Sequence, residues 1–482
     1  MSMGRIKYCL LSVILVMGVL LSSCSSDNDT TPVPIPIPDD DNQDRTELSE
    51  QLEDDIQKVN NNLSFNGIAM MSDITSQLLL KMGRSRNFMV NLKQLITMMV
   101  LKNAVEKAQP VTPGSELEKM GFKAYIPIDI SSYGVRVAFS ERGDYDITPA
   151  QGLEFVFPAT VEPIGTTAFK FKFRNSGSWH ESVYPAKIRN MEGLACINRI
   201  PTAMTMTVSA LLGTEEVTLY EGVVNINIDK SADSEYVSFI DNNFSLNGQM
   251  KSLLQGHDLP EDDGCLGFSY GLEQDGKMQL AFDFNQNGLK LVDFSATSIL
   301  PEDNKFVSMM SEMFLNPSES QDESLMLRLA RIFTDADADF TLDLLDNLHF
   351  VGIIGDVSEY LKALQKVLDN RTGSQVTADE FKSFVETLNQ QWSVVLNNAR
   401  LSAPLLVQMA AEQQNDGFSL QPAFQFGEET DFVPLSQLVS QETLGNYNLL
   451  ISEGFSQVGK ASGAYMELIS KVMQMMPVNI NE

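Results

Sequence analysis

The spacing of hydrophobic positions changes twice along the chain and divides the body of the protein into three regions. In residues 46–120, apolar side chains recur at steps of three and four, which is typical of helices that bury one face. In residues 121–300 the period becomes two, which indicates strands. In residues 301–482 helical spacing dominates again. The pattern predicts an α+β fold in which a central antiparallel β region (a sheet, sandwich or half-barrel) packs against N- and C-terminal helices.

Turn sequences punctuate the β region at regular intervals. Gly213-Thr214-Glu215 separates two alternating runs and predicts a hairpin. Asp275-Gly276 and Asn287-Gly288 separate three further runs, and both dipeptides supply the positive φ that tight hairpin turns require. These turns predict a three-strand meander. Upstream, Ala168–Phe173 alternates phenylalanine with lysine, so we expect an apolar face and a solvated basic face.

The C-terminal region begins helices with recognisable signals. Thr377 and Glu380 are spaced as a capping box, in which each side chain accepts a hydrogen bond from the backbone of the other. Apolar residues from Phe381 through Trp392 to Ala399 then continue at helical steps and predict one long helix with a buried stripe. Residues 418–434 look extended, and a final helix is expected around residues 458–475.

Three segments share one internal pattern: Asn, a large apolar residue, any residue, a large apolar residue, any residue, Gly. They are Asn62–Gly67, Asn243–Gly248 and Asn347–Gly352, and a helix-like sequence follows each. The pattern predicts a short strand that turns at the glycine into a helix. Unequal spacing between the segments argues against a solenoid, and chance similarity is the alternative explanation.

The N-terminus reads as an export signal. A basic start with Arg5 and Lys7 precedes an apolar run and two small residues, and the run is too short for a membrane span. Cys24 follows directly, so residues 1–23 resemble the signal peptide and lipobox of bacterial lipoproteins. The resemblance implies cleavage before Cys24 and acylation of its thiol, for example with palmitate. Several acyl chains would form a stable anchor, since each buried methylene contributes about 0.8 kcal/mol.

Residues 24–45 predict a stalk. The serine and acidic residues directly after Cys24 resemble the export segment of surface lipoproteins of the Bacteroides type, and a plain polar spacer is the alternative. That resemblance implies a location on the outer membrane, facing the cell exterior. Alternating prolines in residues 32–38 favour an extended polyproline II conformation, and the acidic run after them repels itself.

Composition narrows the classes of partner. The 482 residues are 43 % hydrophobic, enough for sizeable cores, and carry a formal net charge of −30. So acidic a protein is unsuited to nucleic acid, which is bound through clustered Lys and Arg, and to peripheral attachment on anionic lipid. The expected partners are therefore the membrane, through the lipid anchor, and a protein or glycan outside it.

The cysteines and histidines give little sign of chemistry. Of four cysteines, Cys196 and Cys265 remain after the signal and anchor are assigned, and they form either one disulfide or two buried thiols. The three histidines, His180, His257 and His349, lack the spacing of metal ligands, and His349 alternates with apolar neighbours as a solvated strand residue does. We expect no cofactor and no transition-metal site.

Two weaker candidate sites remain. Asp335, Asp337 and Asp339 start like a calcium loop, but the sixth position holds Phe340 where that loop needs glycine. A strand with the aspartates facing outward explains the same residues. Trp179 lies in a turn-like segment where its ring could contact a ligand, or fold back onto the sheet.

No catalytic residues can be assigned, because neither a nucleophile elbow nor a phosphate loop occurs. The sequence therefore favours a non-catalytic, lipid-anchored surface lipoprotein with a binding or structural role in the envelope. One alternative is a carrier of a hydrophobic ligand in a β cup, which would need an apolar cavity. Another is an extracellular glycan hydrolase, which would need two carboxyls ~5–10 Å apart.

Overall fold

The computed structural model describes residues 42–64, 108–128, 134–158, 168–230, 234–237, 244–253, 263–300, 333–345, 347–370, 376–414, 417–427 and 431–450, apart from a few single positions, together with scattered residues in 66–77 and 327–331. The chain divides into two compact units. Unit 1 contains Met1–Phe65 and Asp275–Gly459, and unit 2 contains Asn66–Gln274 and Lys460–Glu482. The fold is mainly β with a few helices, which agrees broadly with the α+β prediction.

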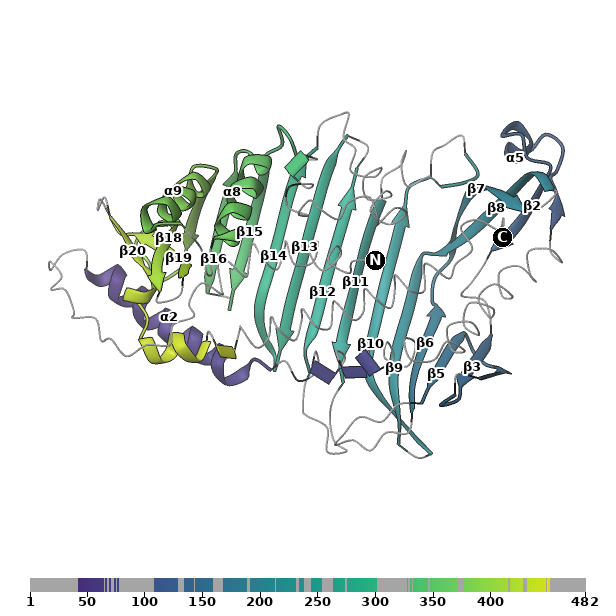
Figure 1. Ribbon diagram of the computed structural model, residues 1–482, viewed down its shortest axis with the longest axis horizontal. Helices are drawn as coiled ribbons and strands as arrows, with labels where there is room; N and C mark the ends of the chain where they lie inside the picture. Colours follow the sequence, from purple (N-terminus) through teal and green to yellow (C-terminus); the bar gives the residue numbers. More distant parts are fainter. Residues whose placement is uncertain are drawn as a thin grey trace. The chain divides into compact units, whose positions relative to one another are not determined.

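Unit 1 is built on eight strands that are hydrogen-bonded in the order β20-β19-β18-β17-β16-β15-β14-β13 (Figure 1). Every pair is antiparallel. Its elements are α2 (Asn42–Asn62), β13 (Lys277–Gln286), β14 (Leu289–Ile299), β15 (Ala338–Leu344), β16 (Leu348–Ile354), α8 (Val357–Asp369), α9 (Ala378–Asn389), β17 (Trp392–Asn397), β18 (Leu405–Gln414), β19 (Gly417–Gln425), β20 (Phe432–Pro434) and the 3-10 helix η1 (Leu435–Gln437).

Unit 2 contains a larger and a smaller sheet. The larger one has the strand order β12-β11-β10-β9-β6-β5-β3-β4 and the smaller one the order β1-β2-β8-β7. Only the pairs β3–β5 and β2–β8 are parallel among the described strands of this unit. Its elements are β1 (Gln109–Pro110), α5 (Glu116–Lys119), β2 (Ala124–Ile128), β3 (Val135–Phe139), β4 (Tyr145–Pro149), β5 (Leu153–Phe157), β6 (Ala168–Asn175), β7 (Trp179–Ile188), β8 (Met191–Pro201), β9 (Ala203–Leu212), β10 (Glu215–Ile228), β11 (Phe244–Ser252) and β12 (Cys265–Leu272).

The turn chemistry places the hairpins where the sequence predicts them. Strands β9 and β10 flank Gly213-Thr214, and β13 and β14 flank Asn287-Gly288. Asn287 and Gly288 both have positive φ, at 53° and 72°, as a two-residue hairpin turn requires. The runs that were expected to form a meander are strands β12, β13 and β14, so the period-two pattern is confirmed there.

The expectation of a mainly helical region after residue 301 is wrong for the part that the structure describes, because six strands lie between Ala338 and Pro434. The capping box at Thr377 and Glu380 does begin α9, but this helix ends at Asn389. The Asn389 side chain accepts hydrogen bonds from Trp392 Nε1 at 3.2 Å and from Met409 N at 2.9 Å. The chain therefore leaves the helix at Asn389, and Trp392 belongs to a strand.

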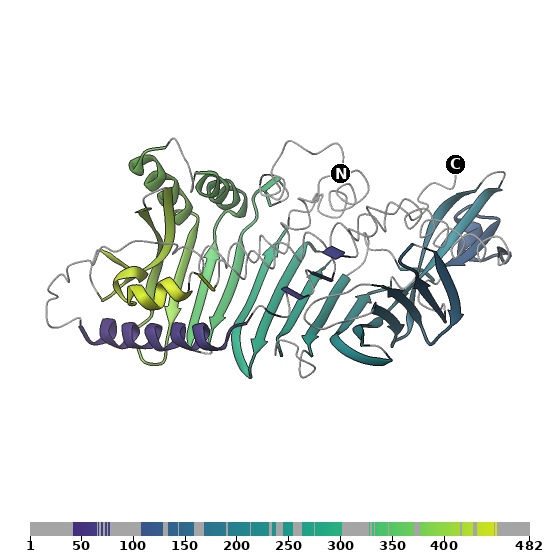
Figure 2. The ribbon, with the colours of Figure 1, turned by 60° about the horizontal axis from the view of Figure 1, so that its bottom comes forward.

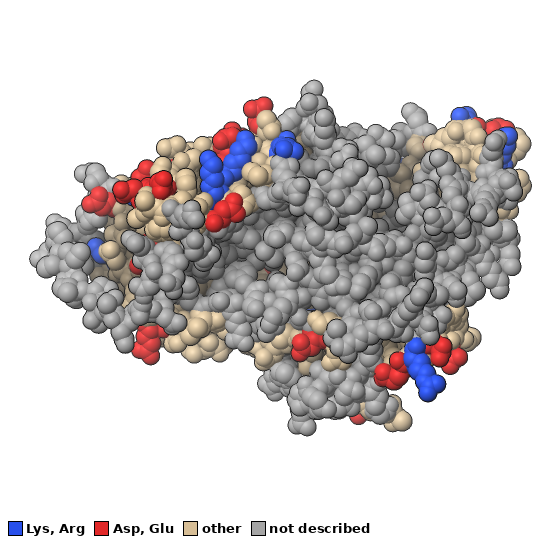
Figure 3. Space-filling view, viewed as in Figure 1, with Lys and Arg blue, Asp and Glu red and all other residues tan. Residues whose placement is uncertain are grey.

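Two helices cover one face of the unit 1 sheet. Figures 1 and 2 show α8 and α9 side by side over the strands, and α9 packs against β17 and β18. Phe381 of α9 is fully buried and stacks on Phe418 of β19 with ring centroids 4.5 Å apart. On their outer side, acidic and basic side chains lie next to one another (Figure 3), as in the 2.7 Å ion pair of Lys362 with Glu359.

The basic face of β6 is less exposed than its alternation predicts. Lys170 is only 5 % exposed and forms an ion pair with Glu216 of β10. Beside it, Glu154 of β5 is also buried and lies 3.1 Å from Arg136 Nε and 3.3 Å from Lys172 Nζ. The lysines of β6 are therefore paired with carboxylates of neighbouring strands instead of being solvated.

The repeated Asn-to-Gly pattern follows the prediction only in part. Asn347–Gly352 lies at strand β16, which α8 follows, and the described residues after Asn62–Gly67 are helical. Gly248, in contrast, lies inside β11, which continues to Ser252. Both glycines are paired across the sheet with a phenylalanine, Gly352 with Phe340 and Gly248 with Phe268. A Cβ on Gly352 would lie 2.5 Å from Phe340 Cε1, so the glycine makes room for the ring.

Several predicted features lie outside the described residues. They are the signal peptide, Cys24, most of the stalk, His257 and the expected final helix. The described chain begins at Asn42, where α2 starts, so the last residues of the predicted 24–45 stalk are helical. Within the described residues, no helix is both long and apolar enough to cross a bilayer.

Candidate functional site: a polar recess beside α2

Helix α2 lies across one end of the unit 1 strands (Figures 1 and 2). Its apolar residues are buried at helical spacing, as the sequence predicts: Leu48, Leu52, Ile56 and Val59. Two polar side chains of the same helix, Gln51 and Asp55, are also almost fully buried, at 2 % and 1 % exposed. Buried polar groups need hydrogen-bond partners, so this helix is held by more than apolar packing.

Asparagines from three strand connections supply partners along α2. Asn287 donates to the Asn62 carbonyl at 2.7 Å, Asn347 donates to the Asp55 carboxylate at 3.2 Å, and Asn398 donates to Gln51 Oε1 at 2.8 Å. The first two connections are two strands apart, a distance of about 9.6 Å. Their contacts on α2 are seven residues apart, or about 10.5 Å along a helix. The helix therefore matches the spacing of these two connections.

On its other side α2 caps a second helical segment, residues 441–447. The Glu53 carboxylate accepts hydrogen bonds from Ser440 N and Ser440 Oγ, both at 2.8 Å, and from Thr443 Oγ1. Ser440 Oγ also accepts from Thr443 N at 3.2 Å, so Glu53 acts as the glutamate of a capping box supplied from a distant part of the chain. Burial raises the pKa of the Glu53 carboxyl, but these hydrogen bonds outweigh burial and lower it below 4.5.

We expect Glu53→Gln to lower the free energy of unfolding of unit 1 by about 1–2 kcal/mol at pH 7, because the amide cannot accept all three hydrogen bonds. A carboxyl with a lowered folded-state pKa stabilises above its ordinary pKa, and this contribution is lost as pH falls through the lowered value. The wild type should therefore lose part of its stability at acid pH, and Glu53→Gln should lose less.

The chain has two tryptophans, and each unit holds one, Trp179 in unit 2 and Trp392 in unit 1. Urea unfolding of Glu53→Gln in a Trp179→Phe background, followed by Trp392 fluorescence, therefore reports unit 1. An unchanged midpoint at pH 7, or an unchanged pH dependence, would contradict the proposed cap.

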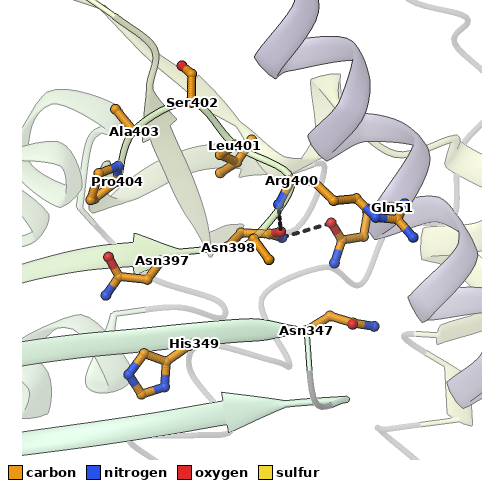
Figure 4. Close-up of a pocket in the computed structure, with 11 residues that line it drawn as sticks. Gln51, Asn347, His349, Asn397, Asn398, Arg400, Leu401, Ser402, Ala403 and Pro404 are labelled. Carbon is orange, nitrogen blue, oxygen red and sulfur yellow. Dashed lines mark hydrogen bonds between the residues drawn. The ribbon is translucent and has the colours of Figure 1, made fainter.

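Between α2 and the connection from β17 to β18 lies a recess of about 460 Å³. Seven of its eleven lining residues are polar, and the other four are small or aliphatic (Figure 4). Its lining residues are Gln51, Asn347, His349, Asn397, Asn398, Ala399, Arg400, Leu401, Ser402, Ala403 and Pro404. The connection is fixed by Asn398, whose Oδ1 accepts from Arg400 N at 2.9 Å, and by Ser402, whose backbone N donates to Asp44 of α2 at 3.1 Å.

The Gln51 amide is the least usual group in this recess. Its oxygen accepts from Asn398, and Figure 4 shows the amide lying between Asn398 and Asn347. Its nitrogen donates to none of the residues that the structure describes, although the side chain is only 2 % exposed. Because Gln51 lines the recess, its two N–H groups are available to an acceptor that enters it. The recess therefore contains a donor that suits a ligand.

A row of polar residues reaches the recess across the exposed sheet face. Directly paired from strand to strand are Asp283, Asp293, Asp343, His349 and Asn397. His349 Nδ1 pairs with Asp343, and in a neutral imidazole this pairing makes Nδ1 the donor and leaves Nε2 as an acceptor. His349 Nε2 and the Asn397 amide then have no hydrogen-bond partner among the described residues. Both groups line the recess and add an acceptor and a donor to it.

The lining of the recess bears on the two alternative functions that the sequence left open. None of its lining residues is a carboxylate, so it lacks the carboxyl pair of a glycan hydrolase. None is a phenylalanine, tyrosine or tryptophan, and four of the eleven carry side-chain amides, so it differs from the apolar cup of a lipid carrier. Neither alternative function gains support here.

The other predicted site residues lie apart from this recess. Trp179 is half-buried at the start of β7, where it is paired with Pro201. Cys196 is buried in β8, whereas Cys265 is partly exposed at the start of β12 and lies 2.6 Å from the Gln249 amide nitrogen. The structure contains no bond between these two cysteines.

The aspartates of the calcium candidate follow the strand explanation. Asp335, Asp337 and Asp339 are all exposed, while Ala336 and Phe340 between them are buried. No group of three metal-ligating side chains is present in the described part of the chain. Of the histidines, His349 is exposed on its strand as predicted, and His180 lies 3.3 Å from the Ile226 carbonyl.

Sequence reasoning missed Gln51, Asn397 and Asn398. Helical periodicity singles out the apolar residues of α2, but the polar residues Asp44, Gln51 and Asp55 also recur at steps of seven and four. This second stripe was the available signal for a second buried face. No protein family, no curated protein and no solved structure matches this chain.

Proposed function

We propose that this chain is a non-catalytic lipoprotein, anchored in the outer membrane through acylated Cys24 and facing the cell exterior, with a binding role in the envelope. The observation that carries the proposal is the position of Cys24 directly after a basic start, an apolar run and Ser22-Ser23. We also propose that the body of this lipoprotein is a β region on which helices from both ends of the chain pack.

The position of α2 is consistent with a body held away from the membrane. The segment from Cys24 to Asn42 spans at most about 60 Å when fully extended. The body then begins with a helix that is fixed to four parts of unit 1, through Asn287, Asn347, Asn398 and Ser440. The binding role rests on the recess, which α2 lines with Gln51.

Replacing Cys24 by serine tests the anchor. Without a thiol to acylate, the protein should move from the membrane fraction to the soluble fraction, because no buried acyl chains remain. Cys265→Ser is the matched control, since it makes the same substitution in the body and should leave the protein in the membrane. Protease added to intact cells should degrade the wild-type protein. Retention of Cys24→Ser in membranes, or survival of the wild type while other surface proteins are cut, would contradict the proposal.

A further inference from the structure

We propose that the recess and the sheet face beside it bind an extended polypeptide segment that carries aliphatic side chains and at least one lysine or arginine. This inference rests on the proposed binding function and names the ligand class for the same site. Three observations carry it: the unused hydrogen-bonding groups in the recess, the aliphatic side chains beside it, and the acidic row that leads to it.

The hydrogen-bonding groups match a peptide backbone. Gln51 Nε2 offers donors, His349 Nε2 offers an acceptor and the Asn397 amide offers both. An extended backbone presents C=O and N–H groups in alternation, and each of them needs a partner once it is removed from water. A carbonyl that reaches Gln51 would accept from an amide nitrogen that donates to none of the described residues.

Aliphatic side chains continue the site on the same sheet face. Val351 lies two residues after His349, and Val395 lies two residues before Asn397 on the antiparallel neighbouring strand. The two valines pair directly with each other, and Val395 pairs with Leu406. Leu406 is 47 % exposed and Ile353 is 50 % exposed. The opposite face of these strands is the one that α9 covers, so this strip is a separate surface. It suits the side chains of a peptide better than a sugar, which would seek an aromatic ring that the recess lacks.

The charge of the polar row selects a basic segment. Asp283, Asp293 and Asp343 oppose one another on adjacent strands, which is unfavourable without cations. Lys290 pairs with Asp293, and the Asn285 amide donates to Asp283 at 2.8 Å, so the row retains negative charge. A lysine or arginine of the ligand would complete it, whereas an acidic segment would be repelled.

The test uses the full-length acylated protein in detergent micelles and a displayed library of random hexapeptides. Enriched peptides should combine Lys or Arg with aliphatic residues and be depleted in Asp and Glu.

The affinity of these peptides should fall about tenfold or more in Gln51→Glu, which keeps an oxygen for Asn398 but loses the donor. Asn397→Ala, at a side chain without a described hydrogen bond, should weaken binding similarly and decides the matter if Gln51→Glu fails to fold. Gln437→Glu adds the same charge at an exposed position outside the recess and should bind normally.

Three results would overturn the inference: no enrichment over empty micelles, enriched peptides whose binding both recess variants leave unchanged, or a neutral oligosaccharide array bound in an Asn397-dependent manner with no peptide bound. The acylation state of Cys24 is read by mass spectrometry on the same sample. An unacylated Cys24 would contradict the proposed anchoring without affecting the peptide result, so the two failures are distinguishable.

Discussion

Replacing Glu216 by glutamine should lower the free energy of unfolding of unit 2 by about 2–3 kcal/mol at pH 7. The variant leaves Lys170, which is 5 % exposed, as a buried charge without its carboxylate. Breaking a fully buried pair from one side costs about 3–5 kcal/mol, and the 40 % exposure of Glu216 reduces this because water can reach the site. Urea unfolding in a Trp392→Phe background, followed by Trp179, measures the change in unit 2.

A variant of Lys170 and the pH dependence of stability both test whether the Lys170–Glu216 ion pair stabilises unit 2. Lys170→Met fills the space without a charge and should cost less than Glu216→Gln, because Glu216 is exposed enough to be hydrated alone. Burial raises the pKa of the Glu216 carboxyl, but the hydrogen bond and charge of Lys170 outweigh it and lower the pKa below 4.5. The wild type should lose this stabilisation as pH falls through the lowered value, and Glu216→Gln should not. Equal stability of wild type and Glu216→Gln would contradict the buried pair.

Replacing Gly352 by alanine should destabilise unit 1 by about 2–3 kcal/mol. The added Cβ would lie 2.5 Å from Phe340 Cε1 and 2.8 Å from Val394 Cγ2, closer than real contacts allow. Phe340 is only 5 % exposed and cannot swing aside, so the strain remains in the core. Urea unfolding in the Trp179→Phe background measures it through Trp392 in the neighbouring strand.

Two further variants test whether the clash with Phe340 is the cause of the loss of stability in Gly352→Ala. Gly355→Ala should be nearly neutral, because its Cβ would have nothing closer than the Gln391 carbonyl at 4.0 Å. Phe340→Leu should be destabilising alone yet should relieve the clash, so the Gly352→Ala/Phe340→Leu double variant should lose less stability than the sum of the singles. Additive losses would show that the ring and the glycine do not compete for the same space.

Local signals predict much of this fold. The Asn287-Gly288 turn, the hairpin at Gly213-Thr214 and the capping box at Thr377 depend on neighbouring residues only, so they can be read directly from the sequence. The alternation in β6 is equally local, but the burial of Lys170 depends on Glu216, far along the chain. Periodicity therefore places the faces of a strand without telling which face meets a partner.

The features that failed to be predicted involve contacts between distant residues. Trp392 continues a helical spacing, yet Asn389 ends α9 because its side chain bonds to Met409 of β18. Gly352 resembles a turn residue in the sequence. In the structure, a glycine is needed there because the ring of Phe340 on the next strand occupies the space of a side chain. The recess combines residues near position 50 with residues near 400, and its main group, Gln51, is one polar residue among many on an acidic helix. Only the folded arrangement gives such residues a common role.

Mass spectrometry of the mature N-terminus, on protein purified from its native membrane, tests the central claim of an anchored surface protein most directly. The first peptide should begin at Cys24 and carry the mass of its acyl chains, with residues 1–23 absent. A peptide that begins with the leader, or with an unmodified Cys24, would contradict the anchor and with it the proposed location of the binding site.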